Sequence, residues 1–207
     1  MSRVGVLRLS LIAAGLAIGL LAGAARAQLA PVPDEMAMGN PRASVTVVEY
    51  ASLGCPHCGV WAREVFPAFK KTYIDTGKVR FVFREMLFGN STLAAAGFMV
   101  ARCSGPANYF GVIDAVFANQ TQIENGGADE LLRVTKPFGL TKDQFKACIE
   151  DAPALRALQA RTDRYVTDYK ITGTPTFVVG DKRLEGEQNL AELAIAIAGA
   201  RAGETRP

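Results

Sequence analysis

The motif Cys55-Pro56-His57-Cys58 constrains the fold of this 207-residue chain more than any other feature. It comes directly after residues 44–50, SVTVVEY, a β-branched and mostly apolar run that is typical of a buried strand. The residues after the motif predict a helix from about Pro56 to Asp75, because large apolar side chains recur at every fourth position. These are Trp61, Val65, Phe69 and Tyr73. The motif is therefore expected where a strand meets the first turn of a helix.

The rest of the chain predicts an α/β fold. Pro67 has no amide hydrogen to donate to the carbonyl of Arg63, so we expect a kink there. Residues 78–85 alternate in polarity and predict a second strand, and a strand, a helix and a strand in this order favour a right-handed βαβ unit. A helical region is expected from about 88 to 170. Strands at 176–179 and 182–185 and a last helix should follow, so that a helical insertion separates a βαβ half from a ββα half.

The N-terminal residues are typical of a secretory signal peptide. Residues 9–25 carry no charge after two arginines, and Ala25-Arg26-Ala27 fits the small residues that signal peptidase prefers. An uncleaved membrane anchor is the alternative, although a run so rich in glycine and alanine is marginal for spanning a bilayer. We therefore expect residues 1–27 to be a signal peptide, 28–43 a lead segment and 44–207 one domain.

The charge distribution argues against nucleic-acid binding. The formal net charge of +3 comes from three arginines of the expected signal peptide, Arg3, Arg8 and Arg26. The remaining chain is balanced and has no positive field for a phosphate backbone. Export would place Cys55, Cys58, Cys103 and Cys148 in an oxidising compartment, where disulfides persist.

Three explanations of the Cys55 to Cys58 motif compete. A zinc or copper site needs a second pair of ligands at similar spacing, and Cys103 and Cys148 each stand alone in the sequence. Gly59 follows Cys58, whereas haem attachment needs histidine there. A purely structural disulfide would close a four-residue loop and contribute only roughly 2 kcal/mol. We therefore expect neither metal nor organic cofactor, with a copper or zinc handling protein as the distant alternative.

The third explanation, a pair of thiols that exchange electrons with a substrate, uses every residue of the motif. With Cys55 at the N-cap and Pro56 at the first helical position, the next amides and the helix dipole would face the Cys55 sulfur and lower its pKa. A protonated His57 would lower it further. A fall in the pKa of Cys55 from about 8.5 to about 4.5 would favour the reduced state by roughly 3.4 kcal/mol at pH 7. For a two-electron couple this raises the reduction potential by about 75 mV. Cys58, deeper in the helix, would be the resolving thiol.

Two further positions are candidates for the same site. Glu49 lies on the first predicted strand and either faces an edge or is a buried carboxylate that relays a proton to or from Cys58. Thr174-Pro175 opens a later strand. Such a turn is common, but a proline there can adopt a cis bond and present the backbone of Thr174 to a bound peptide.

These residues resemble the DsbA-like thiol:disulfide oxidoreductases of the thioredoxin superfamily, in the form found in alphaproteobacterial periplasms. The resemblance covers nearly all of the chain from Gly39 onward. It rests on GNPRASVTVVEYASLGCPHC, on RFVFRE with its alanine-rich helix, on GLTKDQFKAC and on GTPTFVVGDKRLEG. It implies a thioredoxin fold with a helical insertion, Cys55 as attacking thiol with Cys58 as its partner, Pro175 as the cis-proline and Glu49 as the buried acid.

The same resemblance suggests what the protein does and where. It implies a periplasmic thiol oxidase that gives the Cys55-Cys58 disulfide to unfolded or reduced exported proteins and is reoxidised by a DsbB-like quinone-linked membrane protein. Thr174 before the proline is more usual in isomerase-like DsbC and DsbG, so an isomerase or reductase is the alternative. The lead segment is too short for the dimerisation domain of those proteins, and a monomer is expected.

Cys103 and Cys148 lie on apolar faces of predicted helices. They are either free cysteines, which pack as small hydrophobic residues, or a second disulfide that clamps the insertion after export. A loop of 46 residues closed in this way would contribute about 4 kcal/mol.

Overall fold

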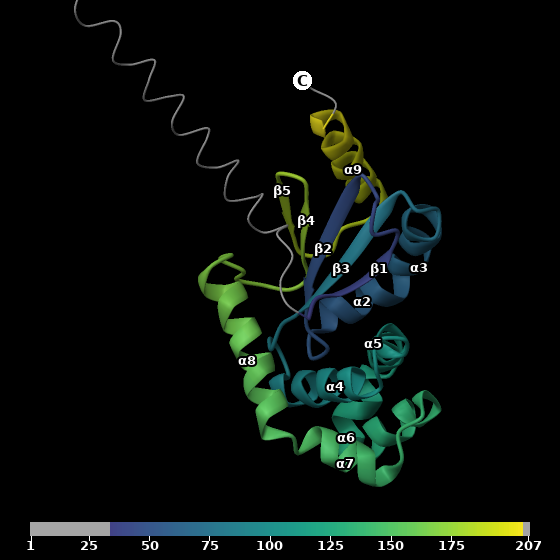
Figure 1. Ribbon diagram of the computed structural model, residues 1–207, viewed down its shortest axis with the longest axis vertical. Coiled ribbons are helices and arrows are strands. Elements are labelled where there is room, and N and C mark those ends of the chain that lie inside the picture. The colour runs from purple at the N-terminus through teal and green to yellow at the C-terminus, as the bar shows by residue number, and fades with distance from the viewer. Residues whose placement is uncertain (1–33, 205–207) are drawn as a thin grey trace, which may run out of the picture.

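A computed structural model describes residues 34–204, and Figure 1 shows their arrangement. The expected signal peptide, residues 1–27, lies outside the described residues. The strands are β1 (Met36–Gly39), β2 (Val45–Ala51), β3 (Val79–Glu85), β4 (Thr176–Val179) and β5 (Lys182–Glu185). The helices are α2 (Pro56–Glu64), α3 (Phe66–Phe69), the π-helix η1 (Lys70–Ile74), α4 (Ser91–Cys103), α5 (Tyr109–Ala118), α6 (Gln120–Thr135), the 3-10 helix η2 (Lys136–Phe138), α7 (Lys142–Ile149), α8 (Ala152–Thr167) and α9 (Leu190–Glu204).

Within the described residues the strands form one five-stranded mixed sheet in the order β1-β3-β2-β4-β5. Strands β2 and β3 are parallel neighbours joined through α2, which confirms the expected βαβ half. The β4-β5 hairpin is antiparallel, and β4 adds to the other side of β2. The fold is therefore α/β with a helical insertion, as predicted, and β2 occupies its centre.

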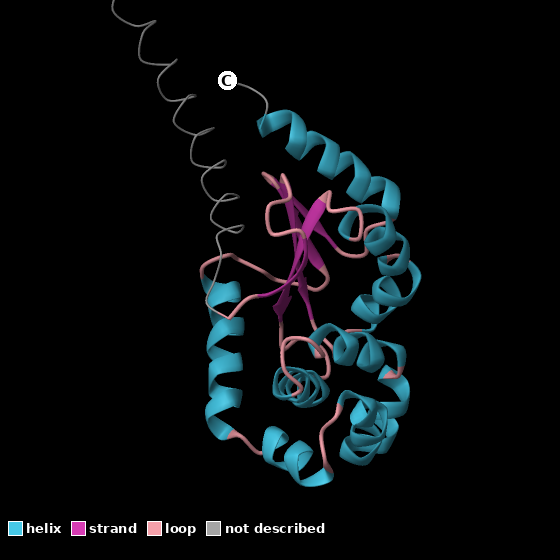
Figure 2. Cartoon of the chain, turned by 45° about the vertical axis from the view of Figure 1, so that its right-hand side comes forward, coloured by secondary structure: helices cyan, strands magenta, loops and turns pink. Residues whose placement is uncertain are grey.

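Residues on β2 alternate between two apolar layers, because successive side chains of a strand point to opposite faces. Val47 and Ala51 join the larger core with Trp61 of α2 and Leu193 of α9. Val48 and Tyr50 face the smaller core, with Tyr165 of α8. Helices accordingly lie on both sides of the sheet, as Figure 2 shows. Glu49 has the same orientation as Val47 and Ala51, and so faces α2.

The insertion consists of helices α4 to α8 and lies at the end of the sheet where β2 finishes (Figure 1). This end also holds the first turn of α2. The insertion is therefore placed to contact the Cys55 motif. None of the helices in residues 34–204 is long and apolar enough to cross a membrane.

Two details differ from the sequence-based expectations. Strand β1 was not predicted, because MAMG has no β-branched residue, and its pairing with β3 supplies what local propensity does not. The predicted helix 56–75 is broken into α2, α3 and η1. The break precedes Pro67, which has no amide hydrogen to donate to the carbonyl of Arg63. The last turn is π-helical, and the amide of Asp75 donates to the carbonyl of Lys70.

Candidate active site

Cys55 is the N-cap residue of α2, and Pro56 follows at the first helical turn. The backbone of Cys55 is extended, with φ −100° and ψ 119°, so its side chain lies beside the free amides of the helix. Both thiols of the motif are free in this structure. Cys55 is 7% exposed and Cys58 is fully buried, so of these two thiols only that of Cys55 can be reached by a partner.

The two thiols have opposite electrostatic environments. The pKa of Cys55 is lowered from 9.0 to about 5, and a hydrogen bond from Cys58 is the largest cause. The side chain of Thr174 and the amides of Cys58 and His57 contribute to the same shift, and burial opposes it. Burial raises the pKa of Cys58, and the hydrogen bond to Cys55 raises it again. Near neutral pH Cys55 is therefore a thiolate, and Cys58 holds its proton.

Thr174-Pro175 lies directly against Cys55. Its peptide bond is cis, and the Cys55 sulfur is 3.3 Å from the Thr174 carbonyl oxygen. Strand β4 begins at the next residue and pairs with β2, and this pairing brings two segments 119 residues apart into contact. The carbonyl of Pro175 in turn accepts a hydrogen bond from the amide of Gly186, at 2.9 Å. The turn is thus fixed from both sides.

His57 has a partner that the sequence did not indicate. Its imidazole is exposed, and its Nδ1 lies 2.5 Å from Oε1 of Glu187 in the loop between β5 and α9. This contact raises the pKa of His57, and attraction to Cys55 is the smallest of the named influences. Residue 57 lowers the pKa of Cys55 through its backbone amide, and its imidazole adds a weak attraction to Cys55.

The loop that carries Glu187 is anchored to α2. Trp61 donates from Nε1 to the carbonyl of Gln188 at 2.9 Å, and Gly186 bonds to Pro175. Glu187 therefore stands between the helix that carries the thiols and the proline turn. No local pattern could reveal it, since 130 residues separate His57 from Glu187.

Glu49 is buried, with 2% of its surface exposed, on the central strand β2. The edge-facing alternative is therefore wrong, since β3 and β4 pair with β2 on its two sides. Its Oε1 atom has no hydrogen-bond partner among residues 34–204. Burial raises the pKa of Glu49 well above its usual range, and the charges of Cys55 and Asp114 raise it further. The surroundings of Glu49 therefore favour its neutral, protonated form.

The insertion holds the loop before Cys55. Gln120 donates from Nε2 to the carbonyls of Leu53 and Cys55, at 2.8 and 3.0 Å. The amide of Asn90 donates to the carbonyl of Gly54. A side chain at Gly54 would place its Cβ 2.1 Å from the Asn90 carbonyl oxygen, so this approach requires glycine. Sequence reasoning had assigned none of these residues to the site.

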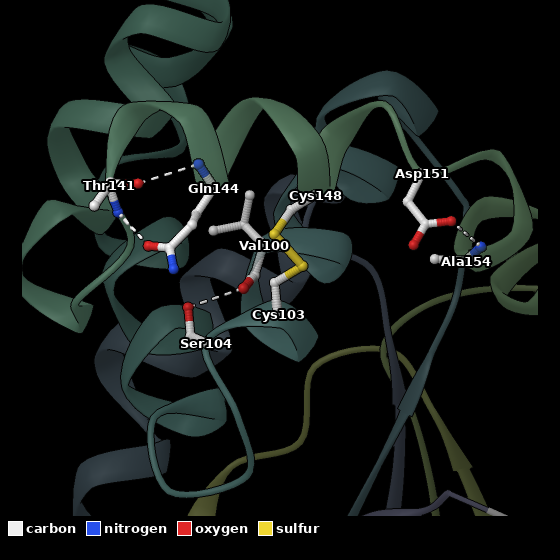
Figure 3. The surroundings of a disulfide bond; sticks show 8 residues. All are labelled: Val100, Cys103, Ser104, Thr141, Gln144, Cys148, Asp151 and Ala154. Carbon is white, nitrogen blue, oxygen red and sulfur yellow. Dashed lines mark hydrogen bonds between the residues drawn. A yellow bond between two sulfur atoms is a disulfide. The ribbon is translucent and has the colours of Figure 1, made fainter.

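A disulfide joins Cys103, the last residue of α4, to Cys148 in α7, as Figure 3 shows. The Cα atoms are 6.1 Å apart, within the usual range for a disulfide. A capping box at Thr141 and Gln144 begins α7 close by. The bond links two helices of the insertion and contains neither thiol of the Cys55 motif.

No three histidine, cysteine, aspartate or glutamate side chains are grouped to hold a metal in the part of the chain that the structure describes. The imidazole of His57 is instead paired with Glu187. The site brings together a thiolate, a buried thiol, a buried carboxyl group whose neutral form is favoured and a backbone carbonyl at the exposed sulfur, and these groups are suited to thiol chemistry.

Comparison with known proteins gives consistent matches. The family model described as thioredoxin matches residues 32–198. A Rickettsia typhi protein, named provisionally as a protein-disulfide oxidoreductase, is 33% identical over 155 residues, which are 73% of this chain and 57% of that protein. Disulfide bond formation protein D of Bacillus subtilis is 27% identical over 176 residues, 78% of this chain and 75% of that protein. This chain thus spans little more than half of the Rickettsia relative.

Among solved structures, Wolbachia pipientis alpha-DsbA1 has a TM-score of 0.78 and 27% identity, with 86% of this chain and 96% of that chain covered. BdbD from Bacillus subtilis has a TM-score of 0.73 at 22% identity, with 82% and 94% covered, which is a likeness of fold.

Proposed function

Because this chain belongs to the thioredoxin family and has a DsbA-like fold, we propose that it is a thiol:disulfide oxidoreductase that donates the Cys55-Cys58 disulfide to newly exported proteins. The observation that carries the proposal is the asymmetry of the two thiols. Cys55 has a pKa of about 5 and touches the Thr174 carbonyl, whereas burial keeps Cys58 protonated. Such a pair is stable when reduced, and so its disulfide is a good oxidant.

The reaction has two exchanges. A substrate thiolate attacks the Cys55 sulfur, the Cys55-Cys58 bond breaks, and Cys58 leaves with the electron pair. Because the pKa of Cys58 is raised, this sulfur takes a proton, and the neutral acid Glu49 is the donor that lies behind it. A second substrate thiolate then attacks the substrate sulfur of the mixed disulfide, and Cys55 leaves as a stable thiolate. Two electrons have passed from the substrate to the enzyme.

The backbone of the proline turn supports substrate binding at this position. The Thr174 carbonyl lies 3.3 Å from the sulfur that would carry the mixed disulfide. An extended substrate segment that pairs with the turn would be held with its cysteine at Cys55. We assign Cys55 and Cys58 to the exchange, Glu49 to proton transfer, Pro56 and His57 to the helix start that stabilises the thiolate, and Thr174 and Pro175 to substrate alignment.

The thiolate makes a definite contribution to the potential. A pKa lowered from 9.0 to about 5 stabilises the reduced protein by about 2.7 kcal/mol at pH 7, which is about 60 mV. The lowered pKa stabilises the reduced protein fully above pH 9.0, the ordinary pKa of the thiol. This stabilisation is lost as the pH falls through 5, where Cys55 takes up a proton.

The partners and location form part of the proposal. We expect reduced exported proteins as substrates, a DsbB-like membrane oxidase for reoxidation, a monomer, and a periplasmic site of action reached through the signal peptide of residues 1–27. A DsbC-like or DsbG-like isomerase would instead rescue scrambled ribonuclease better than it oxidises the reduced form. A metal-handling protein would carry copper or zinc after purification.

The test is the reduction potential of the Cys55-Cys58 couple against glutathione. It is measured with Cys103 and Cys148 both replaced by alanine, so that one couple reports. A value above about −180 mV is expected of a disulfide donor, whereas a value near about −270 mV would contradict the proposal. Cys55→Ser should abolish oxidation of a reduced peptide, and turnover retained by that variant would refute the mechanism.

A further inference from the structure

The buried acid Glu49 lines a small, partly open cavity together with a second carboxylate, Asp114 of α5, which is exposed at the surface. Both residues line this cavity, and its other walls are apolar and mainly aromatic. They come from α2, α3, β3 and α5, among them Trp61, Phe83 and Phe117. The two carboxylates belong to different parts of the fold, since Glu49 is on the central strand and Asp114 is on the insertion.

The cavity has room for about one water molecule. Its volume is about 10 Å³, close to the smallest space that a buried water occupies. A buried water is stable where it makes hydrogen bonds to polar groups, and the Oε1 atom of Glu49 has no partner among the described residues. Glu49 therefore has an oxygen atom in need of a hydrogen-bond partner and lines a cavity that can hold a water molecule.

Asp114 also reaches the outside of the molecule. It lines a second, open groove of about 340 Å³ between α2 and α5, together with Arg63 and Lys70. Phe66 and Phe117 line both spaces as well. Asp114 is thus the ionisable residue common to the small cavity and the larger groove.

We propose that Asp114 is the solvent end of a proton path to Glu49, which passes through one water in the cavity between them. The inference rests on the proposed function, in which Glu49 supplies a proton to Cys58. When the Cys55-Cys58 bond breaks, the proton moves from Glu49 to the Cys58 sulfur and leaves a buried carboxylate. That carboxylate regains a proton from the water, the water from Asp114, and Asp114 from solvent. Reoxidation runs the same path outward.

The charges around the path fit this role. Partial burial raises the pKa of Asp114 to about 6, and Lys70 opposes the rise. A carboxyl group with a pKa near neutrality can both take and release protons there. The charges of Cys55 and Asp114 raise the pKa of Glu49, and Glu49 in turn raises the pKa of Cys58. A buried carboxylate at Glu49 is therefore unfavourable, and a proton that reaches it removes this cost.

The experiment compares Asp114→Asn with Asp163→Asn, a matched change on the exposed face of α8. The single tryptophan, Trp61, lies one turn after Cys58, and its fluorescence can follow oxidation of a reduced peptide in a single turnover. We expect Asp114→Asn to slow the Cys58-coupled step by about tenfold, less than the loss of a general acid itself. Asp163→Asn should have no effect.

Chemical rescue separates a proton path from a structural role. Because Asp114 lines an open groove, acetate should restore the rate of Asp114→Asn in a saturable way, and Asp114→Glu should retain activity. Acetate should not affect the wild type. In a Glu49→Gln background, Asp114→Asn should cause no further slowing, since the path then leads nowhere.

The outcomes distinguish this inference from the function on which it rests. If Glu49→Gln slows the step and Asp114→Asn does not, the path is refuted and the function stands. If Asp114→Asn is slow without rescue, or slows the Glu49→Gln variant further, its effect is structural and the path is also refuted. If Glu49→Gln itself has the wild-type rate, the proton role of Glu49 fails, while the exchange at Cys55 remains tested by its own variant.

Discussion

Replacement of Thr174 by valine should make the protein a weaker oxidant. Valine keeps the shape of threonine but lacks the hydroxyl, and the Thr174 side chain is among the groups that lower the pKa of Cys55. A hydrogen bond to a charged group contributes about 1.5 kcal/mol, so the pKa of Cys55 should rise by about one unit, to about 6. The Cys58 hydrogen bond and the amides at the helix start remain.

The expected magnitude follows from linkage. At pH 7 the thiolate stabilises the reduced wild type by about 2.7 kcal/mol, and a pKa of about 6 reduces this to about 1.4 kcal/mol. The potential should therefore fall by about 30 mV. A lowered thiol pKa stabilises the reduced protein only at pH values above that pKa. The difference in potential between the two proteins should therefore disappear at about pH 4, where Cys55 is protonated in both.

Two measurements check this prediction. Ultraviolet absorbance of the thiolate gives the pKa of Cys55, and equilibration with glutathione gives the potential. Thr172→Val is the matched control, since Thr172 is an exposed threonine of the same turn. An unchanged pKa in Thr174→Val, or a fall in potential that persists at about pH 4, would refute the argument that the hydroxyl acts on the thiolate.

Two further predictions concern other parts of the structure. Glu187→Gln should lower the pKa of His57 towards its ordinary value, because the carboxylate that raises it is gone; nuclear magnetic resonance titration of the imidazole measures this, and Glu185→Gln should leave it unchanged. Joint replacement of Cys103 and Cys148 by alanine should reduce the free energy of unfolding by about 4 kcal/mol in oxidising urea titrations, because the unfolded chain loses a closed loop. Equal stability before and after that change would show that the disulfide contributes nothing.

Hydrogen bonds from the helical region fix the loop before Cys55. Gln120 at the start of α6 holds two carbonyls of the loop before α2, and Ser52 donates from Oγ to the carbonyl of Phe88 at 2.6 Å. These bonds cross between the sheet and the helical region. The position of the Cys55 sulfur therefore depends on contacts from α6 as well as on its own helix.

Local order along the chain was predictable from the sequence. The strand before Cys55 and the β4-β5 hairpin follow from side-chain alternation and β-branched residues, and the helix start follows from Pro56. These patterns report interactions within a few residues. The resemblance then supplied the thioredoxin form of that fold, and the family match agrees with it.

The partners of these residues were decided by the tertiary structure. Strand β1 has no strand-like sequence and exists because β3 offers a free edge. His57 pairs with Glu187 across 130 residues, and Glu49 shares a cavity with Asp114 because α5 packs over α2. The sequence by itself indicated most of the strands and helices and the place of Cys55 at the start of a helix, since these depend on neighbouring side chains. Only the packing of distant segments decided which charges and carbonyls face those thiols, because such contacts leave no pattern along the chain.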